Sequence, residues 1–381
     1  MAAPTHTMPL DDAALAWLAL ALVPELLPRR SFALVERFGT PRAVLAAPAG
    51  ALAAADVPPA VVASVGRASS RARAETLKLA AAGATLVAWS DDAYPPALRH
   101  IAQPPLVLAV RGRMGGPAEP AIAIVGARRA TPYGLEVAAQ LARDLAARGV
   151  TIVSGFARGI DSAAHRAALD AGGRTIAVLG SGIDVVYPPE NRRLADAVAA
   201  RGALVTQFPP GTPPLPYHFP TRNRTLAALA LGVVVVEAAE RSGSLSTAGF
   251  AGDLGREVYA VPGKITSPTS VGAHRLLRDG ARLVETWADI VQELPDAWRR
   301  RVRDTGVAPI DSTQPSKGSD EERMLQLLMR DEAQHIERLI ARAGMDAARA
   351  GAILTGLELG GLARQLGGQR WIAVGARSEG A

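Results

Sequence analysis

The spacing of hydrophobic and polar positions changes twice along the chain. Between residues 10 and 80, apolar residues recur at helical spacing in short stretches that Pro or Gly interrupts. From residue 121, continuous apolar runs of strand length alternate with amphipathic stretches of helical length. After residue 320 the helical spacing returns and ends in two short strand-like runs about Gly367 and Gly368. The pattern therefore predicts three structural units.

The central apolar runs predict a parallel sheet, because strands that are apolar throughout are typical of sheets covered by helices on both faces. The predicted strands are Ile122–Val125, Thr151–Val153, Thr175–Leu179, Leu204–Thr206, Val233–Val236 and Val258–Val261. The predicted helices span 132–147, 161–171, 190–201, 221–231, 244–254 and 270–279. This alternation is typical of an α/β fold with a Rossmann-like, doubly wound parallel sheet.

The flanking segments predict smaller units. Short helices indicate a helical module over 1–82, of SAM-like or helix-hairpin-helix type. The Rossmann-like domain is predicted over 83–298 and begins with an irregular, proline-containing lead-in. The polar segment 299–319 contains Pro and Gly and predicts a flexible linker. Three helices and a hairpin over 320–381 are typical of a winged helix.

Composition narrows the chemistry. The chain has 381 residues and no cysteine, which excludes disulfides, thiolate nucleophiles and zinc–cysteine sites. Its six histidines have no metal-ligand spacing, so we expect no metal or other cofactor. The longest N-terminal apolar run, 13–23, is too short to cross a bilayer, and the acidic segment before it does not resemble a signal peptide. We therefore expect a cytoplasmic protein with no membrane partner.

The charge balance favours a polyanionic partner. The formal net charge is +6 and the pI about 10.1, although high Arg usage is equally compatible with a GC-rich genome. Aromatic residues make up only 4% of the chain, so an extended base-stacking surface is not expected. Backbone phosphates would then provide most contacts with a single strand. Phe156, Tyr217 and Phe219 are the nearest candidates for stacking, and each is equally compatible with the core.

Every predicted strand is followed by a turn that contains glycine. Because the carboxyl ends of parallel strands share one edge, these turns are expected to lie together. Glycine lets backbone amides approach a ligand, and helix N-termini, hydroxyls and guanidinium groups can complete a phosphate site. The candidate phosphate-binding residues are Gly126, Arg128, Ser154, Gly155, Arg158, Arg222, Arg224, Arg241, Ser242, Gly243, Ser244 and Lys264.

Arg222 and Arg224 occupy an unusual position. If Thr221 caps the predicted helix, both lie in its first turn, where the helix dipole disfavours a cation. An anion bound at this helix end would remove the conflict. The alternative is that the two side chains pair with acids such as Glu237 or face solvent; the neighbouring cations favour phosphate contact.

Enzyme motifs are weak. The chain lacks a Walker P-loop and a dinucleotide fingerprint. Asp161 and His165 are four residues apart and could form an acid–base pair. We favour a helix-capping Asp161 and a packed His165, because no nucleophile accompanies them.

Several motifs resemble those of the DNA-processing protein A (DprA/Smf) family. They are "IVGARRATPYG", "SGFARGIDSAAH", "GRTIAVLGSGIDVVYPPEN", "FPTRNR", "SGSLSTA" and "VPG", in the family's order and spacing over roughly residues 85 to 290. The resemblance implies that Asn223 of "FPTRNR" also lines the binding pocket. It further implies a non-enzymatic recombination mediator, usually dimeric. Such a protein protects incoming single-stranded DNA and loads the RecA recombinase during natural transformation.

Two other functions remain open. A nucleotide-processing enzyme of the phosphoribohydrolase-like type would use a similar fold, although Gln207 replaces one candidate for its glutamate. A transcription regulator would act through the winged helix. Its helix over about 346–360 has Arg349 against Asp346 and Glu358, so we expect this module to contact a protein, or to pack on the main domain, rather than to read duplex DNA.

Overall fold

The computed structural model describes residues 11–116, 119–303, 319–329, 332–359 and 362–374. They form two compact units. The first contains the N-terminal helices and a large sheet, over residues up to Arg129 and Ala138–Arg303, and the second contains residues 130–137 and the C-terminal part. Most of the linker predicted at 299–319 lies outside the described residues, and the domain boundaries stay predictions.

The N-terminal module is helical, as predicted. Its helices are α1 (Asp12–Ala21), α2 (Pro28–Phe38), α3 (Pro41–Ala46), α4 (Ala49–Ala53) and α5 (Pro59–Ala81). Asp11 caps α1 by accepting a hydrogen bond from the amide of Ala13, and Thr40 caps α3 in the same way. Proline at the start of α2, α3 and α5 suits the first helical turn, where no backbone donor is needed.

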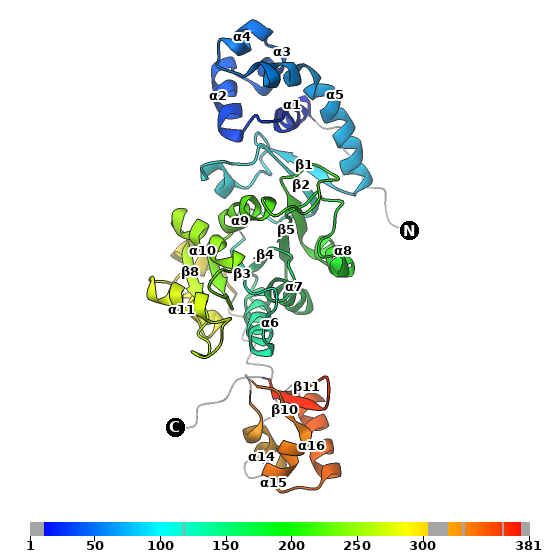
Figure 1. Ribbon diagram of the computed structural model, residues 1–381, viewed down its shortest axis with the longest axis vertical. Coiled ribbons are helices and arrows are strands. Elements are labelled where there is room, and N and C mark those ends of the chain that lie inside the picture. Colours follow the sequence, from blue (N-terminus) through cyan, green and yellow to red (C-terminus); the bar gives the residue numbers. More distant parts are fainter. Residues whose placement is uncertain (1–10, 117–118, 304–318, 330–331, 360–361, 375–381) are drawn as a thin grey trace. The chain divides into compact units, whose positions relative to one another are not determined.

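The large sheet has the order β1-β2-β6-β5-β4-β3-β7-β8-β9 (Figure 1). Its strands are β1 (Thr85–Ala88), β2 (Val107–Gly112), β3 (Ala121–Val125), β4 (Thr151–Ser154), β5 (Thr175–Val178), β6 (Ala203–Thr206), β7 (Gly232–Val235), β8 (Glu257–Ala260) and β9 (Arg282–Leu283). The strands from β3 to β9 are parallel to one another, and β2 is antiparallel to both β1 and β6. The six predicted strands are confirmed to within one residue.

Helices cover both faces of this sheet. They are η1 (Pro96–His100), α6 (Pro132–Ala147), α7 (Ile160–Asp170), η2 (Pro189–Asn191), α8 (Arg192–Arg201), α9 (His218–Leu229), α10 (Gly243–Asp253), α11 (Val271–Arg278), α12 (Trp287–Val291) and α13 (Asp296–Arg299). Alternate strand residues serve different faces: Val205 belongs to the core cluster that includes residues of α9 and α10, whereas Leu204 belongs to the cluster that includes residues of α8. The doubly wound, Rossmann-like prediction is therefore confirmed.

The order of the strands places a switch point beside β3. The chain builds β4, β5 and β6 on one side of β3 and then returns to place β7 on the other side. The loops after β3 and β7 therefore diverge and leave a crevice at the carboxyl edge of the sheet.

The C-terminal part of the second unit has its own core and the winged-helix arrangement predicted from the sequence. Its elements are α14 (Asp320–Leu327), β10 (Gln334–His335), α15 (Ile336–Ala343), α16 (Ala347–Leu359), β11 (Ala363–Leu366) and β12 (Arg370–Ala373). The strands form a small antiparallel sheet in the order β10-β12-β11. Met324, Leu339, Leu354 and Trp371 are buried between the helices and this sheet.

The parallel strands should dominate the stability of the first unit. Ile152 is fully buried in β4 between β3 and β5, so Ile152→Ala should lower its free energy of unfolding by about 2–5 kcal/mol. The control Leu77→Ala removes a side chain that is 74% exposed and should change stability by less than about 0.5 kcal/mol. Urea unfolding followed by circular dichroism compares the two, and equal midpoints would contradict the expectation.

Candidate nucleic-acid interface

A cleft opens at the carboxyl edge of the sheet, at the switch point. One part has a volume of about 270 Å³ and is lined by the ends of β3 and β4 and the starts of α9 and α10. A narrower part continues toward the loops after β5 and β6, and the two share Arg128, Gly155, Ala157, Phe219 and Arg222. We call these two parts together the cleft.

Arg222 lies at the base of the cleft and is almost completely buried, with 5% of its surface exposed. Its Nη1 atom donates hydrogen bonds to the carbonyl of Gly155, directly after β4, and, at 2.6 Å, to the carbonyl of Val178, the last residue of β5. Burial lowers the pKa of Arg222 to about 10, with Asp161 opposing the shift and Arg128 adding to it. Arg222 therefore links two strand ends besides lining the cleft.

The reason predicted for the position of Arg222 is wrong. Helix α9 begins at His218, not after Thr221, so Arg222 lies in its second turn. Thr221 does not cap the helix, because its hydroxyl donates to the carbonyl of Tyr217 at 3.4 Å. The positive charge of Arg222 is stabilised by carbonyl groups at the ends of the strands rather than by Glu237 or by solvent.

Asn223 extends this connection to the next helix. Its side-chain oxygen accepts from Nε of Arg222 at 3.0 Å, and its amide donates to the carbonyl of Gly243 at 3.3 Å and the hydroxyl of Ser246 at 2.9 Å. These bonds hold the start of α10 beside α9. One continuous network thus runs from the ends of β4 and β5 to the first turn of α10.

The cationic group most available at the cleft is Arg128. It follows β3, is exposed, and lies over the ring of Phe219 with 5.1 Å between its guanidinium carbon and the ring centroid. Within the described part of the chain, Arg128 makes no hydrogen bond or ion pair through its guanidinium. This arrangement offers a charged group for phosphate beside an aromatic ring for a base.

Close packing explains why two positions in the turn after β4 are glycine. A Cβ atom at Gly155 would lie 2.8 Å from Nη1 of Arg222, so a larger residue would displace the guanidinium. Gly159 has a φ of +73°, and a Cβ there would lie 2.3 Å from the carbonyl oxygen of Ala127. Both glycines allow the turn after β4 to pack against its neighbours.

The start of α10 supplies donors and hydroxyls on the other side of the cleft. Ser242 caps the helix by accepting from the amide of Ser244 at 3.3 Å, and the two hydroxyls lie 2.7 Å apart. Together with Gly126 and Gly243, both serines line the cleft.

The remaining predicted site residues are paired, buried or outside the cleft. Arg158 lines the narrow part but forms a two-point ion pair with Glu190, with 3.0 Å between Nη2 and Oε2. The Ser154 hydroxyl is buried and donates to the carbonyl of Ile124 at 2.6 Å. Arg224 donates to Gln103, and neither it, Arg241 nor Lys264 lines the cleft as the structure delimits it.

Asp161 and His165 do not form the alternative acid–base pair. Asp161 is buried and accepts from the amide of Ala157 at 3.2 Å; burial raises its pKa and Arg222 opposes the shift. His165 is buried against Thr175, with 2.6 Å between Nδ1 and Oγ1. Because Thr175 donates its own proton to the carbonyl of Ile152, His165 is the donor in this contact. Burial lowers the pKa of His165, which favours the neutral imidazole.

Tyr187 and Glu190 were not predicted as site residues from the sequence, and Phe219 was not distinguished from two other aromatic residues. Phe156 is part of the core, and Tyr217 is 67% exposed but does not line the cleft. Tyr187 and Glu190 follow the Gly180–Gly182 turn within "DVVYPPEN". Their position after a parallel strand was the available signal.

The described residues show neither a metal site nor a membrane-spanning helix. Among the described residues, no group of His, Cys, Asp and Glu side chains could hold a metal ion. Nor is any helix in these ranges long and apolar enough to cross a membrane.

Comparisons with known proteins agree with this architecture. Residues 85–295 match the family model for DNA recombination-mediator protein A, and residues 308–369 match that for the DprA winged helix domain. A DprA-type DNA processing protein of Mycobacterium tuberculosis (strain H37Rv) is 48% identical over 223 residues, which are 55% of this chain. The match spans 57% of that relative's own length.

Two solved structures are also similar. DNA processing protein A (DprA) from Streptococcus pneumoniae has a TM-score of 0.64 and 32% identity, covering 76% of this chain and 99% of that one. DNA processing protein A from Helicobacter pylori, described for its single-stranded DNA binding mode, has a TM-score of 0.50 and 27% identity. That match covers 55% of this chain and 96% of the other.

The buried imidazole predicts a pH dependence of stability. Burial lowers the pKa of His165 to about 3, so below its usual value of about 6.5 only the unfolded chain binds the proton. Wild type should therefore lose about 1.4 kcal/mol of stability per pH unit from this group as the pH falls from about 6 to 4. In His165→Gln this contribution should be absent. Urea unfolding across this range tests it, and parallel pH profiles for the two proteins would refute it.

Proposed function

Because the chain belongs to the DNA recombination-mediator protein A family, we propose that it binds single-stranded DNA in the cleft as a recombination mediator. The observation that carries the proposal is the exposed Arg128 guanidinium, free of ion pairs within the described residues and placed over Phe219 at the switch point. A nucleic-acid strand presents both partners that this pair suits: a phosphate for the cation and a base for the ring.

The rest of the cleft fits a sugar-phosphate chain. Hydroxyl groups of Ser242 and Ser244 lie at the start of α10, where the helix dipole favours an anion. The two connected parts of the cleft give an elongated surface rather than a closed pocket. The similar H. pylori protein, described for its single-stranded DNA binding mode, further supports this ligand.

The proposed roles of the predicted site residues differ. Arg128, Gly126, Gly155, Ser242, Gly243 and Ser244 would contact or closely approach the strand. Arg222 and Asn223 would chiefly shape the cleft, and Ser154 would act only through strand packing. Arg158 would bind phosphate after release from Glu190, and Arg224, Arg241 and Lys264 would contact DNA that extends beyond the cleft.

In the cell, we propose that the protein protects incoming single strands and loads the RecA recombinase onto them during natural transformation. It would act in the cytoplasm as a homodimer. These steps follow the family resemblance.

Binding without turnover fits the cleft better than nucleotide hydrolysis. A hydrolase needs a carboxylate that is free to act on its substrate, but Asp161, although it lines the cleft, is almost completely buried and accepts a hydrogen bond from the amide of Ala157. Gln207 replaces the candidate glutamate, and its side-chain oxygen accepts from the hydroxyl of Thr225 at 2.6 Å. Release of free base from a nucleoside monophosphate would support the hydrolase instead.

Arg128→Ala should weaken binding of single-stranded oligonucleotides about 10-fold, to a similar extent for all sequences, because a phosphate contact carries no base information. The slope of log affinity against log salt concentration should fall by about 0.7. The matched control is Arg129→Ala, which removes an adjacent exposed arginine that does not line the cleft. Fluorescence anisotropy measures both; equal losses in the two variants would contradict the assignment.

Glu190→Gln should strengthen binding about 3- to 10-fold at low salt, because it frees Arg158 and removes a negative charge from the path of the strand. The control Asp196→Asn breaks a comparable exposed pair with Arg111, which pairs with Leu204 toward the amino end of β6. It should leave affinity unchanged. Weaker binding by Glu190→Gln would indicate that the ion pair shapes the site rather than competing with DNA.

A further inference from the structure

A second group of cations lies on helix α5, outside the cleft and outside the region that matches the central family model. Arg67, Arg71 and Lys78 are exposed and occupy positions i, i+4 and i+11. With 3.6 residues per turn these positions fall on one stripe of the helix, and the rise from Arg67 to Arg71 is about 6 Å. We call Arg67, Arg71 and Lys78 the α5 stripe.

The stripe is held in place from beneath. Val65, Ala68, Ala72 and Leu79 bury the inner face of α5. Arg71 donates through Nη1 to the carbonyl of Leu22 at 3.1 Å, which fixes the guanidinium while its other nitrogens remain available.

The two other cations of the stripe differ in their partners. Arg67 has no hydrogen bond or ion pair through its side chain within the described ranges. Lys78 forms an ion pair with the buried Glu75, with 2.8 Å between Nζ and Oε1. Arg67 and Arg71 are therefore the strongest candidates for binding a ligand.

An open groove accompanies the two arginines. It has a volume of about 400 Å³ and is lined by Leu22, Pro24, Ser64, Arg67, Ala68, Ser70 and Arg71. Apolar atoms of Leu22, Pro24 and Ala68 lie beside the guanidinium groups. A ligand that combines negative charge with apolar surface, as a nucleotide does, suits this lining.

The directions of the strands place α5 on the side of the cleft. Strand β1 is antiparallel to β2, and β2 is antiparallel to β6, so Ala88 at the end of β1 lies toward the edge that carries the cleft. The core of the helical module includes Ala88, Leu106 and Val107 from this edge and Ala68 and Ala72 of α5. Leu79 packs farther down the sheet, with Ala109 and α8. Arg67 and Arg71 therefore lie toward or beyond the edge that carries the cleft.

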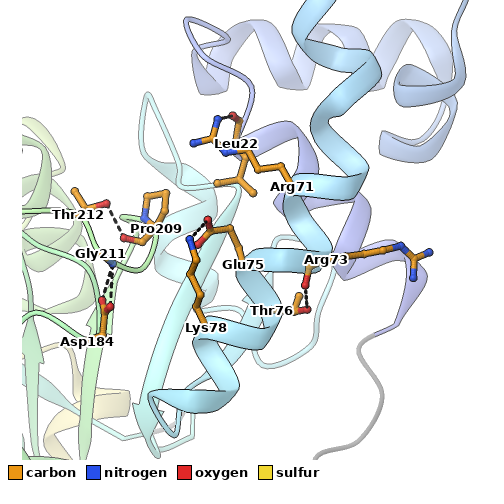
Figure 2. Close-up of polar contacts among 10 residues, drawn as sticks. All are labelled: Leu22, Arg71, Arg73, Glu75, Thr76, Lys78, Asp184, Pro209, Gly211 and Thr212. Carbon is orange, nitrogen blue, oxygen red and sulfur yellow. Dashed lines mark hydrogen bonds and ion pairs between the residues drawn. The ribbon is translucent and has the colours of Figure 1, made fainter.

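Loops that line the cleft also approach α5. Asp184, after β5, accepts from the amide of Gly211, after β6, at 2.8 Å, which joins the two loops. Ser181 and Pro214 of the same loops line the cleft. Figure 2 shows Glu75 and Lys78 on the side of α5 turned toward Pro209, Gly211 and Thr212, whereas Arg73 points away.

We propose that single-stranded DNA leaving the cleft continues past the loops after β5 and β6 and binds through its phosphates to Arg67 and Arg71 on α5. This inference rests on the proposed function, because the cleft fixes one part of the strand. The two guanidinium groups, one helical turn apart, can then contact the phosphates that follow. The N-terminal module thereby lengthens the bound segment without adding sequence preference.

The experiment compares Arg67→Ala/Arg71→Ala with wild type on oligonucleotides of two lengths, about 6 and about 25 nucleotides, by fluorescence anisotropy. The double variant should bind the long strand about 5- to 20-fold more weakly, with a salt slope smaller by about 1.4, the value for two lost phosphate contacts. Its affinity for the short strand should equal that of wild type, because that strand fills only the cleft.

Arg73→Ala is the matched control. It removes the same charge from the same helix, but on the face that points away from the loops, so it should retain wild-type affinity for both strands. Arg67→Glu is a second test that keeps the contact between Arg71 and Leu22, and it should weaken long-strand binding at least as much as the double alanine variant.

The outcomes separate the two proposals. Wild type that binds neither oligonucleotide would refute DNA binding by the cleft. Wild type that binds both, with no loss on the long strand in Arg67→Glu or the double variant, would overturn the role of α5 alone. Equal losses with Arg73→Ala would also overturn it, because they would reflect net charge; α5 would then be a surface for a partner of another class, such as an acidic protein.

Discussion

The buried guanidinium of Arg222 resolves an electrostatic problem that every parallel sheet presents at its carboxyl edge. Strand carbonyls direct partial negative charge toward that edge, where a phosphate chain would be repelled. Arg222 places a positive charge on the carbonyls of Gly155 and Val178, and the connection through Asn223 fixes the start of α10. The cost of burying the cation is offset by these bonds and by Asp161 nearby. The electropositive cleft depends on this arrangement.

Because Arg222 donates its hydrogen bonds to backbone carbonyls, other groups must make the direct contacts with a ligand. Arg128 is exposed beside Phe219, and its charge also contributes to lowering the pKa of Arg222. A bound anion would relieve that repulsion between cations. Glu190 has the opposite effect, since its pairing with Arg158 neutralises a cation at the narrow part of the cleft. The affinity of the cleft for an anionic ligand thus depends on the exposed Arg128 and on how far Glu190 neutralises Arg158.

The arrangement of the central domain could be predicted from the sequence because each strand and turn is specified by residues that are adjacent in the chain. Apolar runs bounded by glycine placed six strands within one residue, and their shared direction placed the turns on one edge. Two-residue strands such as β9 and β10 are too short to show a pattern. The burial of Arg222 could not be predicted, because it depends on where α9 begins and on carbonyls from β4 and β5. The pairing of Arg158 with Glu190, 32 residues apart, is likewise a product of the tertiary fold.

The N-terminal module is positioned by packing against β1 and β2, the antiparallel strands of the large sheet. Strands β1 and β2 extend the sheet in the antiparallel sense, and Ala88 and Val107 at their shared end join the core of the module. This packing fixes the rotation of α5 about its axis, because Ala68 and Ala72 must face inward. Arg67 and Arg71 are then held outward as a consequence of core packing, without needing any polar interaction to orient the helix. A ligand that meets them finds both side chains on a fixed helix and the Arg71 guanidinium already held by Leu22, which reduces the conformational entropy lost on binding.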